Sequence, residues 1–274
     1  MWAHKPWIGR FYPAATRAER TLEAYAGLLN AVEGNTTFYA LPSAHLVARW
    51  AEQVPADLRI AFKLPRRITH ERRLRGAEAD VAEFLTRLAP LADRMGPTSV
   101  QLPASFAPAD LGTLAAFLAA LPAEHRWAVE VRHRGFFAGG AAEAPLDELL
   151  ASRRVDRVIL DSRALYGGPR ETDEEREQIR TKPELPVRPV ATARHRVVRF
   201  IGQNEPEANP VFWRPWIATC ARWLADGREP YVFVHTPANA FSPALARRFH
   251  AEVAAVTAGL APLPGPPEAV AGLF

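Results

Sequence analysis

Ionisable side chains follow short apolar segments of this sequence, and four of them are of the types that perform acid/base chemistry. They are Lys63, Glu130, His133 and Asp161. Glu130 could exchange a proton with either Asp161 or His133. A desolvated Lys63 could lose its charge and act as a base or as a nucleophile toward a carbonyl group. We therefore predict these four residues to be catalytic.

Each of these residues also has a purely structural interpretation, because buried charges in proteins are usually paired. The ion pairs that the sequence offers are Lys63 with Glu33 or Glu130, and Glu130 and Asp161 with Arg132 and Arg199. For any single residue the structural interpretation is at least as good. For the whole set, a ligand site is the better interpretation.

Further polar residues lie where apolar segments end, and we predict that they bind substrate. They are Glu33, Asn35, His70, Gln101, Arg132, Arg199 and His235. If the segments are parallel strands, their carboxyl ends meet at one edge of the fold. We expect Glu33, Lys63, Gln101, Glu130, Arg132, Asp161 and Arg199 to converge in one concavity there.

No cofactor is predicted, although a divalent metal stays an open alternative. His70, His133, His235, Glu33, Glu130 and Asp161 are suitable ligand types. The sequence has no H-E-x-x-H motif, and its single cysteine, Cys220, excludes a cysteine cluster. No residue is therefore assigned as a metal ligand.

Five arginines lie between residues 64 and 75, directly after an apolar segment. They could bind phosphate groups or nucleic acid. The alternative, which we slightly favour, is that residues 64–75, here called the arginine loop, are only a solvated loop of an arginine-rich protein. No aromatic residue lies between the arginines, so stacking on single-stranded bases is not indicated.

The segments that must position these residues alternate between strand and helix patterns. One strand is predicted to end at Glu33, and further strands are predicted over 58–63, 99–102, 127–131, 155–161, 197–201 and 231–235. One helix is predicted to begin at Thr16, and further helices are predicted over 43–53, 77–88, 110–121, 146–151, 212–225 and 243–257. Trp213, Trp216 and Trp223 are predicted to lie in the core. Strands that recur every 30 to 40 residues are typical of βα units. Seven units in 274 residues favour an α/β fold of the TIM-type (β/α)8 barrel kind. A doubly wound sheet is the alternative, disfavoured because no glycine-rich nucleotide-binding motif follows a strand.

We expect residues 1–258 to form a single barrel domain. The polar segment 162–195 interrupts the alternation, starts a short helix near 171–175, and should form a mobile lid over the site. Residues 259–274 are rich in proline, alanine and glycine and are predicted to be a strap or a disordered tail.

The composition is that of an ordinary globular protein, with 48% hydrophobic and 23% charged residues and a net charge of +4. No segment has the length of apolar sequence that a membrane span needs, and no secretory signal is visible. We expect a cytoplasmic protein without membrane partners. A small-molecule substrate is the expected partner, and nucleic acid stays an alternative. The sequence does not indicate an oligomeric state.

Several ordered blocks between Trp2 and His250 resemble the YecE-like family (domain of unknown function 72), in one bacterial subgroup. The blocks are Phe11-Tyr12-Pro13, Val32-Glu33-Gly34-Asn35-Thr36-Thr37-Phe38-Tyr39, Phe62-Lys63 with Thr69-His70, Gln101-Leu102-Pro103, Val129-Glu130-Val131-Arg132-His133, Leu160-Asp161-Ser162, Arg199-Phe200-Ile201-Gly202 and His235-Thr236-Pro237. The resemblance implies a TIM-type barrel with a polar mouth. It implies no activity.

The resemblance also implies a strand that this sequence lacks. Family members begin with an apolar strand just before the segment that matches 2–7, and Met1 falls after that strand. We therefore expect seven parallel strands, with a gap between the strands that end at Glu33 and His235. Truncation, or a start codon assigned too late, would explain why the sequence lacks this first strand.

Three functions are compatible with these observations. The first is an enzyme acting on a small polar or anionic substrate by acid/base chemistry at the strand carboxyl ends, with hydrolysis as one alternative for the reaction. The second is a nucleic-acid-associated or phosphodiester-handling protein that uses the arginine loop. The third is a non-catalytic interaction protein, because residues 271–274 resemble the end of a sliding-clamp-binding peptide without its glutamine.

Overall fold

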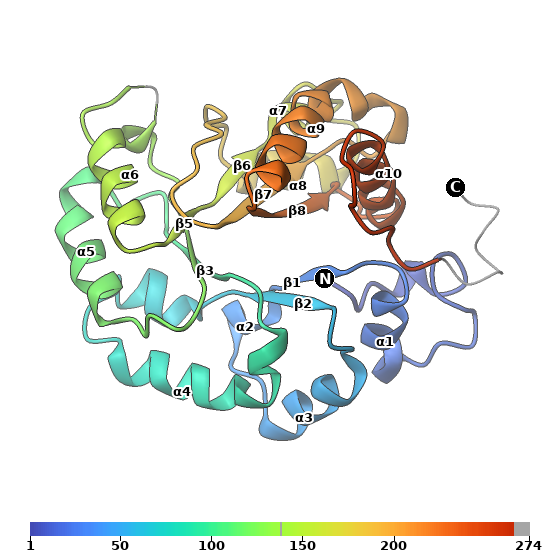
Figure 1. Cartoon of the computed structure of the whole chain (residues 1–274), viewed down its shortest axis with the longest axis horizontal. Helices are drawn as coiled ribbons and strands as arrows, with labels where there is room; N and C mark the ends of the chain where they lie inside the picture. Colours follow the sequence, from blue (N-terminus) through green and yellow to red (C-terminus); the bar gives the residue numbers. More distant parts are fainter. Residues whose placement is uncertain (138, 266–274) are drawn as a thin grey trace. The chain divides into compact units, whose positions relative to one another are not determined.

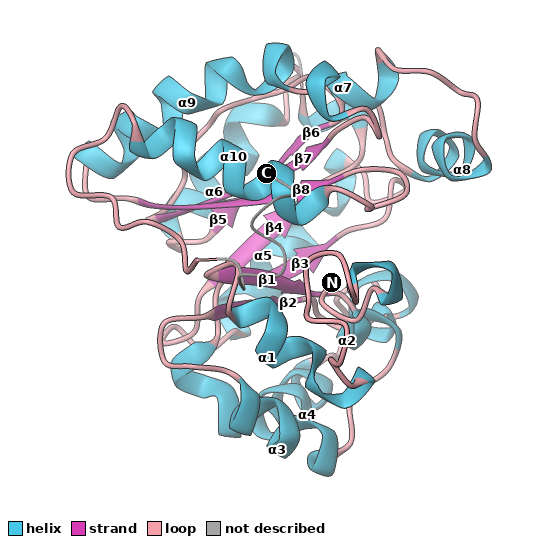
Figure 2. Ribbon diagram, turned by 90° about the vertical axis from the view of Figure 1, so that its right-hand side faces the viewer, coloured by secondary structure: helices cyan, strands magenta, loops and turns pink. Residues whose placement is uncertain are grey.

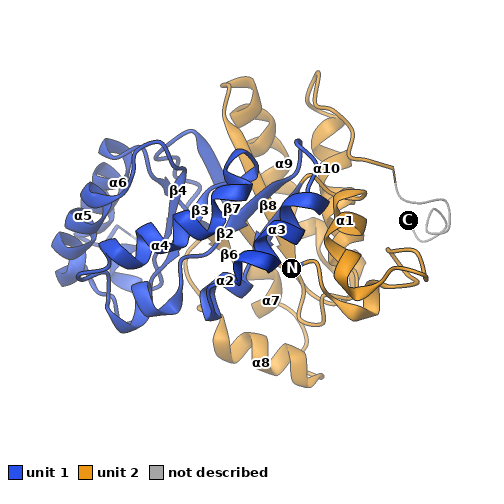
Figure 3. Cartoon of the chain, turned by 90° about the horizontal axis from the view of Figure 1, so that it is seen from below, with its two compact units in different colours: residues 1, 31–159, 188–197 blue, residues 2–30, 160–187, 198–274 orange. Residues whose placement is uncertain are grey.

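The structure is a computed structural model that describes residues 1–137 and 139–265. The chain divides into two compact units, each built from separate stretches of sequence (Figure 3). Unit 1 contains Met1, residues 31–159 and residues 188–197. Unit 2 contains residues 2–30, 160–187 and 198 onward.

Unit 1 alternates strands with helices. Its elements are β1 (Ala31–Gly34), α2 (Thr36–Tyr39), α3 (Ala44–Gln53), β2 (Arg59–Phe62), a π-helical turn (Arg67–Glu71), α4 (Glu78–Leu88), a 3₁₀ helix (Ala89–Arg94), β3 (Thr98–Gln101), α5 (Leu111–Ala120), β4 (Trp127–Glu130), α6 (Glu143–Ser152) and β5 (Asp156–Arg157). The order along the chain is visible in Figure 1. Helix α3 begins after Ser43, whose hydroxyl oxygen accepts a hydrogen bond from the Leu46 amide, as expected of an N-cap.

The strands of unit 1 are parallel, and their register decides which side chains share a face. Strand β1 pairs with β2, and β3 pairs with β4, which pairs with β5. Single bridges at Ile60–Met95 and Lys63–Ser99 connect β2 to the segment around β3. Because paired residues of parallel strands point to the same face, the polar residues of these strand ends share one face. They are Glu33, Lys63, Gln101 and Glu130 at the carboxyl ends, and Asp156 at the start of β5.

The opposite face of these strands is covered by helices. The ring of Trp50 on α3 stacks on Phe62 of β2, with centroids 6.1 Å apart. Val100 and Val129, paired in register, are completely buried. This apolar face anchors the strands and leaves their other face to the polar residues.

Unit 2 contains the third sheet and the helices packed on it. Its elements are α1 (Thr21–Ala26), β6 (Ile159–Asp161), α7 (Arg163–Tyr166), α8 (Asp173–Thr181), β7 (His195–Ile201), α9 (Pro210–Ala225), β8 (Glu229–His235) and α10 (Ser242–Ala254). The first residue of β6 and residues 195–197 of β7 belong to unit 1. The sheet order is β6-β7-β8, and Figure 2 shows the three strands together. Trp213, Trp216 and Trp223 of α9 are buried, which confirms the prediction that this series is core.

Most predicted elements are confirmed within a few residues, and two differ. The helix predicted from Thr16 begins only at Thr21, after a 3₁₀ turn over Ala18–Arg20. The strand predicted over 155–161 is divided into β5 and β6, which pair in different sheets. Seven predicted strands therefore correspond to eight observed ones.

The predicted α/β fold with parallel strands is confirmed, but the three sheets are not closed into a barrel. Strands β1 and β8, the two expected to flank a missing strand, each stand at the end of their sheet. The preceding strand itself stays a prediction.

The segment predicted as a lid begins directly after β6. Its helix α8 has a capping box, in which Thr172 and Glu175 bind each other's backbone amides. Glu175 also accepts a hydrogen bond from Asn204, at 3.1 Å, so this part of the segment is tied to unit 2. The lid role stays a prediction. Of the predicted tail, 259–265 has no regular structure and 266–274 lies outside the described residues.

Within the described residues, no helix is both long enough and apolar enough to span a lipid bilayer.

Candidate functional site

Lys63 and Gln101 are joined at the carboxyl ends of neighbouring strands. The Lys63 ammonium donates a hydrogen bond of 3.1 Å to Oε1 of Gln101. Both residues are buried, Lys63 directly after β2 and Gln101 as the last residue of β3. An apolar strand therefore positions a buried cation where an amide oxygen accepts a hydrogen bond from it.

Glu130 lies beside Gln101 in the β3–β4 register and is 0% exposed. Its Oε1 accepts a hydrogen bond of 2.7 Å from Nε of Arg132, and Nη2 of Arg132 is also 2.7 Å away. A buried carboxylate requires such compensation. The predicted structural pair of Glu130 with Arg132 is thus present, at the same strand end as Gln101.

Glu33 is the last residue but one of β1 and lies on the same face of the strands. Asn35 donates to its Oε2 at 3.4 Å. The next turn connects this strand to Lys63, because the Thr37 hydroxyl donates to the Lys63 carbonyl oxygen at 2.7 Å. Sequence reasoning did not single out Thr37, a completely buried hydroxyl that fixes the backbone of Lys63.

His70 extends this group of side chains from the π-helical turn after β2. Its Nδ1 is 2.9 Å from the Thr69 hydroxyl, and its ring meets the edge of Phe38 at 5.1 Å between centroids. Burial lowers the pKa of His70, and the nearby cations Arg132 and Arg66 lower it further. His70 is therefore a neutral imidazole at neutral pH.

His133 has a local structural role. Its Nδ1 accepts a hydrogen bond of 3.0 Å from the Gly135 amide and so caps the 3₁₀ turn Arg134–Phe136. In the neutral ring this places the proton on Nε2. The catalytic role of His133 stays a prediction.

Asp161 belongs to unit 2 and is completely buried. Arg163 donates to it from its backbone amide at 3.1 Å and from Nε and Nη2 at 2.9 and 2.8 Å. The indole of Trp216 donates to Oδ2 at 2.8 Å. Four donors hold this carboxylate in a fixed position, and its catalytic role also stays a prediction.

The two other predicted site residues of unit 2 lie on neighbouring strands. Arg199 is buried within β7, and His235 is the last residue of β8. The backbone oxygen of His235 accepts a hydrogen bond of 2.7 Å from the Gly202 amide. The structure thus brings together Glu33, Asn35, Lys63, His70, Gln101, Glu130 and Arg132 in unit 1, and Asp161, Arg199 and His235 belong to unit 2.

Sequence reasoning missed a second polar group in unit 1, formed by Asp156, His195 and Arg196. Nδ1 of His195 and Nη1 of Arg196 are 3.6 and 3.5 Å from the Asp156 carboxylate. Burial raises the pKa of Asp156. Asp156 pairs with Ala128, so it lies two positions before Glu130 on the same face. The only signal in the sequence for this role of Asp156 was its position in a segment with an alternating strand pattern.

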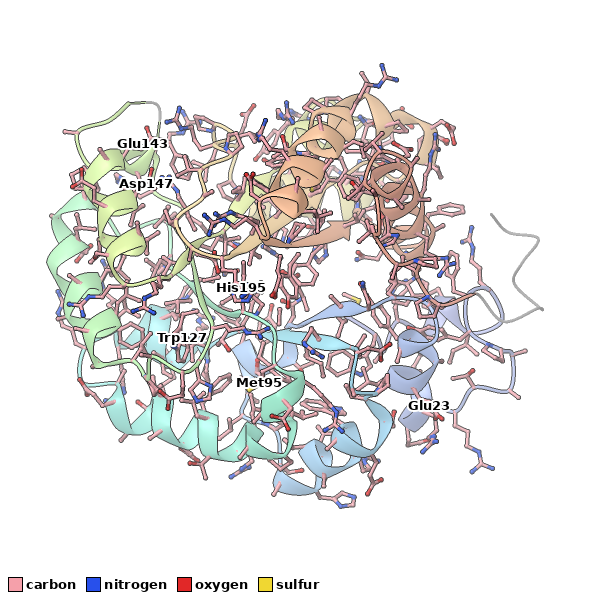
Figure 4. All side chains as sticks on the ribbon, in the orientation of Figure 1. Glu23, Met95, Trp127, Glu143, Asp147 and His195 are labelled. Atoms are coloured by element: carbon pink, nitrogen blue, oxygen red, sulfur yellow. The ribbon has the colours of Figure 1, made fainter. Side chains whose placement is uncertain are left out.

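Two ion pairs lie nearby, one of them formed by Arg157 on the opposite face of β5. Arg157 donates to Oδ1 of Asp147 at 2.6 Å, and Arg188 is 2.6 Å from Glu143. Figure 4 labels Asp147 and Glu143 on α6, and it labels His195 on β7. The Arg157 and Arg188 pairs bind α6 to β5 and to the segment 188–197.

The arginine loop carries its own acidic partners. The pairs are Arg66 with Glu71 at 3.9 Å, Arg67 and Arg72 with Asp80 at 3.2 and 3.0 Å, and Arg73 and Arg75 with Asp110 at 2.8 and 3.9 Å. Three carboxylates therefore offset part of the positive charge. This pairing fits the solvated-loop interpretation.

In the described part of the chain, no group of three or more His, Cys, Asp or Glu side chains is arranged to hold a metal ion. The open alternative of a divalent metal gains no support from the geometry.

A family profile described as "Protein of unknown function DUF72" matches residues 1–269, nearly the whole chain. The chain belongs to the DUF72 family.

Curated relatives agree with this membership. The chain is 42% identical over 245 residues to the UPF0759 protein YecE of Escherichia coli K12, covering 89% of this chain and 87% of the relative. The same protein of Escherichia coli O157:H7 matches with equal identity and coverage. The expected resemblance to YecE-like proteins is confirmed.

Solved DUF72 structures share the fold. A family protein from Enterococcus faecalis V583 matches with a TM-score of 0.64 at 20% identity, covering 92% of this chain and 93% of the other. One from Thermotoga maritima MSB8 matches with a TM-score of 0.63 at 22% identity, covering 90% and 94%. DUF72 membership fixes the fold class, and the function must be argued from the site.

Proposed function

We propose that this DUF72 protein is an enzyme that acts on a small anionic substrate by acid/base chemistry. The observation that carries the proposal is the row of buried polar groups at the ends of β1 to β4. In this row Lys63 is hydrogen-bonded to Gln101, and Gln101 is paired in register with Glu130. Burying such groups costs free energy that an apolar set would not, which favours a functional reason for them.

Glu130 and His70 are the groups suited to move a proton. Glu130 is fully buried on a strand, so its position is fixed. His70 has a lowered pKa and is a neutral base at neutral pH. Thr69 stands beside its Nδ1, which leaves Nε2 as the nitrogen for exchange with substrate.

Lys63 and Arg132 are the groups suited to bind the anion. A planar guanidinium recognises carboxylate or phosphate with two parallel donors, and a lysine ammonium adds a point charge. Gln101 and Glu130 orient these two cations through hydrogen bonds of 3.1 and 2.7 Å. Lys63 is also the group that would react with a substrate carbonyl, if the reaction is covalent.

His133 and Asp161 are given positioning rather than reacting roles in this proposal. Nδ1 of His133 is occupied by the Gly135 amide, and four donors already surround the Asp161 carboxylate. A proton acceptor whose lone pairs are all occupied is a poor base.

We also propose that the three sheets form parts of one TIM-type (β/α)8 arrangement. The parallel register within unit 1, the helix after almost every strand and the polar residues at strand carboxyl ends support it. A crystal structure of the chain tests it. Strands of all three sheets arranged around one axis are expected, and three separate open sheets would contradict it.

The test of function is ligand-induced stabilisation of the whole chain by a panel of small phosphates and carboxylates. At least one anion should raise the melting temperature, because a ligand that binds only the folded state stabilises it. Arg132→Gln and Lys63→Met should abolish the shift. The anion that binds is then incubated with the protein, and conversion followed by NMR should be lost in Glu130→Gln.

Arg67→Gln is the matched control, since it removes one exposed cation of the arginine loop. It should leave the shift unchanged. A shift that depends on Arg67 and not on Arg132 would move the binding site to the arginine loop, and no shift with any anion would contradict the proposal. Because Arg132→Gln leaves Glu130 buried without this partner, the double variant E130Q/R132Q serves as a second test.

A further inference from the structure

The turn after β1 carries two aromatic rings beside the candidate site. Tyr39 is the most exposed large hydrophobic side chain among the described residues, at 80%. Its ring meets Phe38 edge to face, with centroids 5.2 Å apart. Phe38 in turn meets the His70 ring at 5.1 Å. The three rings form a continuous series from solvent to His70.

This series is fixed to the carboxyl ends of the strands. Helix α2 (Thr36–Tyr39) follows β1 directly, and Thr37 at its start is hydrogen-bonded to the Lys63 backbone in both directions, at 2.7 and 3.3 Å. Tyr39 is therefore two residues from the contact that positions Lys63. An exposed ring held on a rigid turn loses little conformational freedom when it binds a ligand.

Two cations lie at the inner end of the series, each with a carboxylate beside it. Arg132 and Arg66 lower the pKa of His70, after burial as the main cause, whereas Glu130 and Glu71 raise it. Arg132 is largely buried, and Arg66 is exposed on the turn after β2. An anion at His70 would be attracted by both cations.

We propose that Tyr39 and Phe38 form a stacking subsite for a planar ring, so that the substrate is an aromatic or heteroaromatic compound carrying a phosphate or carboxylate. The inference rests on the proposed function, because the anionic group occupies the site at Lys63 and Arg132. The ring of the substrate lies against Tyr39, and its acidic group points toward His70. This assigns specificity to a turn that takes no part in proton transfer.

Two matched pairs of probes test the ring and identify the acidic group. Adenosine 5′-monophosphate is compared with ribose 5-phosphate, and benzoate is compared with acetate. In one pair, the ring-bearing member should bind the full chain more tightly, by about fivefold to tenfold, as expected for one aromatic contact. The pair that shows this preference tells whether the site takes phosphates or carboxylates.

Two variants show whether Tyr39 is responsible. Tyr39→Ala should remove the preference for the ring-bearing probe and leave the affinity for the ring-free probe unchanged. Tyr39→Phe keeps the ring and should keep the preference. Val256→Ala removes another exposed apolar side chain, in unit 2, and should change neither affinity.

The outcomes separate this inference from the proposed function. Equal binding of both members of each pair, lost in E130Q/R132Q, overturns the stacking subsite and leaves the anion site standing. A ring preference that survives in Tyr39→Ala also overturns it. No binding of any probe overturns the subsite, and failure of the wider anion panel overturns the proposed function.

Discussion

The Lys63 ammonium donates a 3.1 Å hydrogen bond to the amide oxygen of Gln101, across two strands and 38 positions of sequence. Both side chains are buried at the carboxyl ends of β2 and β3. A hydrogen bond to a charged group in such a place contributes to both stability and geometry. It makes Gln101 the natural point at which to perturb the site.

Replacing Gln101 by leucine removes the acceptor and keeps a side chain of similar size. We expect the free energy of unfolding to fall by about 1.5–3 kcal/mol, the contribution of a hydrogen bond to a charged group. Urea unfolding followed by circular dichroism measures it. Gln101→Glu keeps an acceptor and should lose less, and an equal loss in both variants would show that the hydrogen bond does not matter.

Gly34 ends β1 where its neighbour leaves no room for a side chain. An added Cβ would lie 2.5 Å from Cδ1 of Phe62. Gly34→Ala should therefore destabilise the protein by about 1–3 kcal/mol through overpacking. Gly112→Ala is the control, since a Cβ there meets nothing within 4 Å; it lies in α5 and should stabilise by about 0.4–1 kcal/mol. Equal effects at both positions would contradict the packing argument.

His70 should titrate below the ordinary histidine value of 6.5, because burial and then Arg132 and Arg66 lower its pKa. The unfolded chain binds this proton more readily than the folded one. The contribution of His70 to stability is therefore fully present above pH 6.5 and is lost as the pH falls through the folded pKa. An NMR titration of the histidine ring protons measures the folded value. Arg132→Gln should raise it, and an unchanged value would show that the guanidinium has no influence.

Asp161 should tolerate the loss of its negative charge poorly. Asp161→Asn replaces one of two oxygens that accept hydrogen bonds from Arg163 and Trp216, and leaves a donor facing donors. We expect a loss of about 1.5–3 kcal/mol in the free energy of unfolding. Trp216→Phe removes only one of the donors, although it also leaves a small cavity. Urea unfolding compares the two variants, and a neutral effect of Asp161→Asn would mean that the hydrogen bonds contribute nothing.

Cys220 should be unreactive in the folded protein. It is buried on α9, and burial raises the pKa of its thiol to about 12, so almost no thiolate forms at neutral pH. A thiol reagent such as DTNB should modify the protein only after denaturant is added. Fast modification of the native protein would show that α9 opens.

The sequence by itself determined the type and order of most elements, because buried side chains recur along the chain with the period of a strand or of a helix. The alternation in the strand that ends with Lys63 and the spacing of Trp213, Trp216 and Trp223 report which side of each element is covered. The polar residue at each strand end is readable for the same reason. The helix start expected at Thr16 was wrong because neighbouring contacts, and not the capping residues alone, decide where a short helix begins.

The tertiary structure alone decided which of those residues meet when they are far apart in the sequence. The pair of Glu130 with Arg132, two residues apart, was among those that the sequence offered. In contrast, Gln101 accepts from Lys63 across 38 positions, and Asp161 accepts from Trp216 across 55 positions. The pairing of Asp156 with His195 and Arg196 was likewise unreadable, since 39 or more positions separate them. The register between strands sets such contacts, and it depends on packing over the whole sheet and not on any local period.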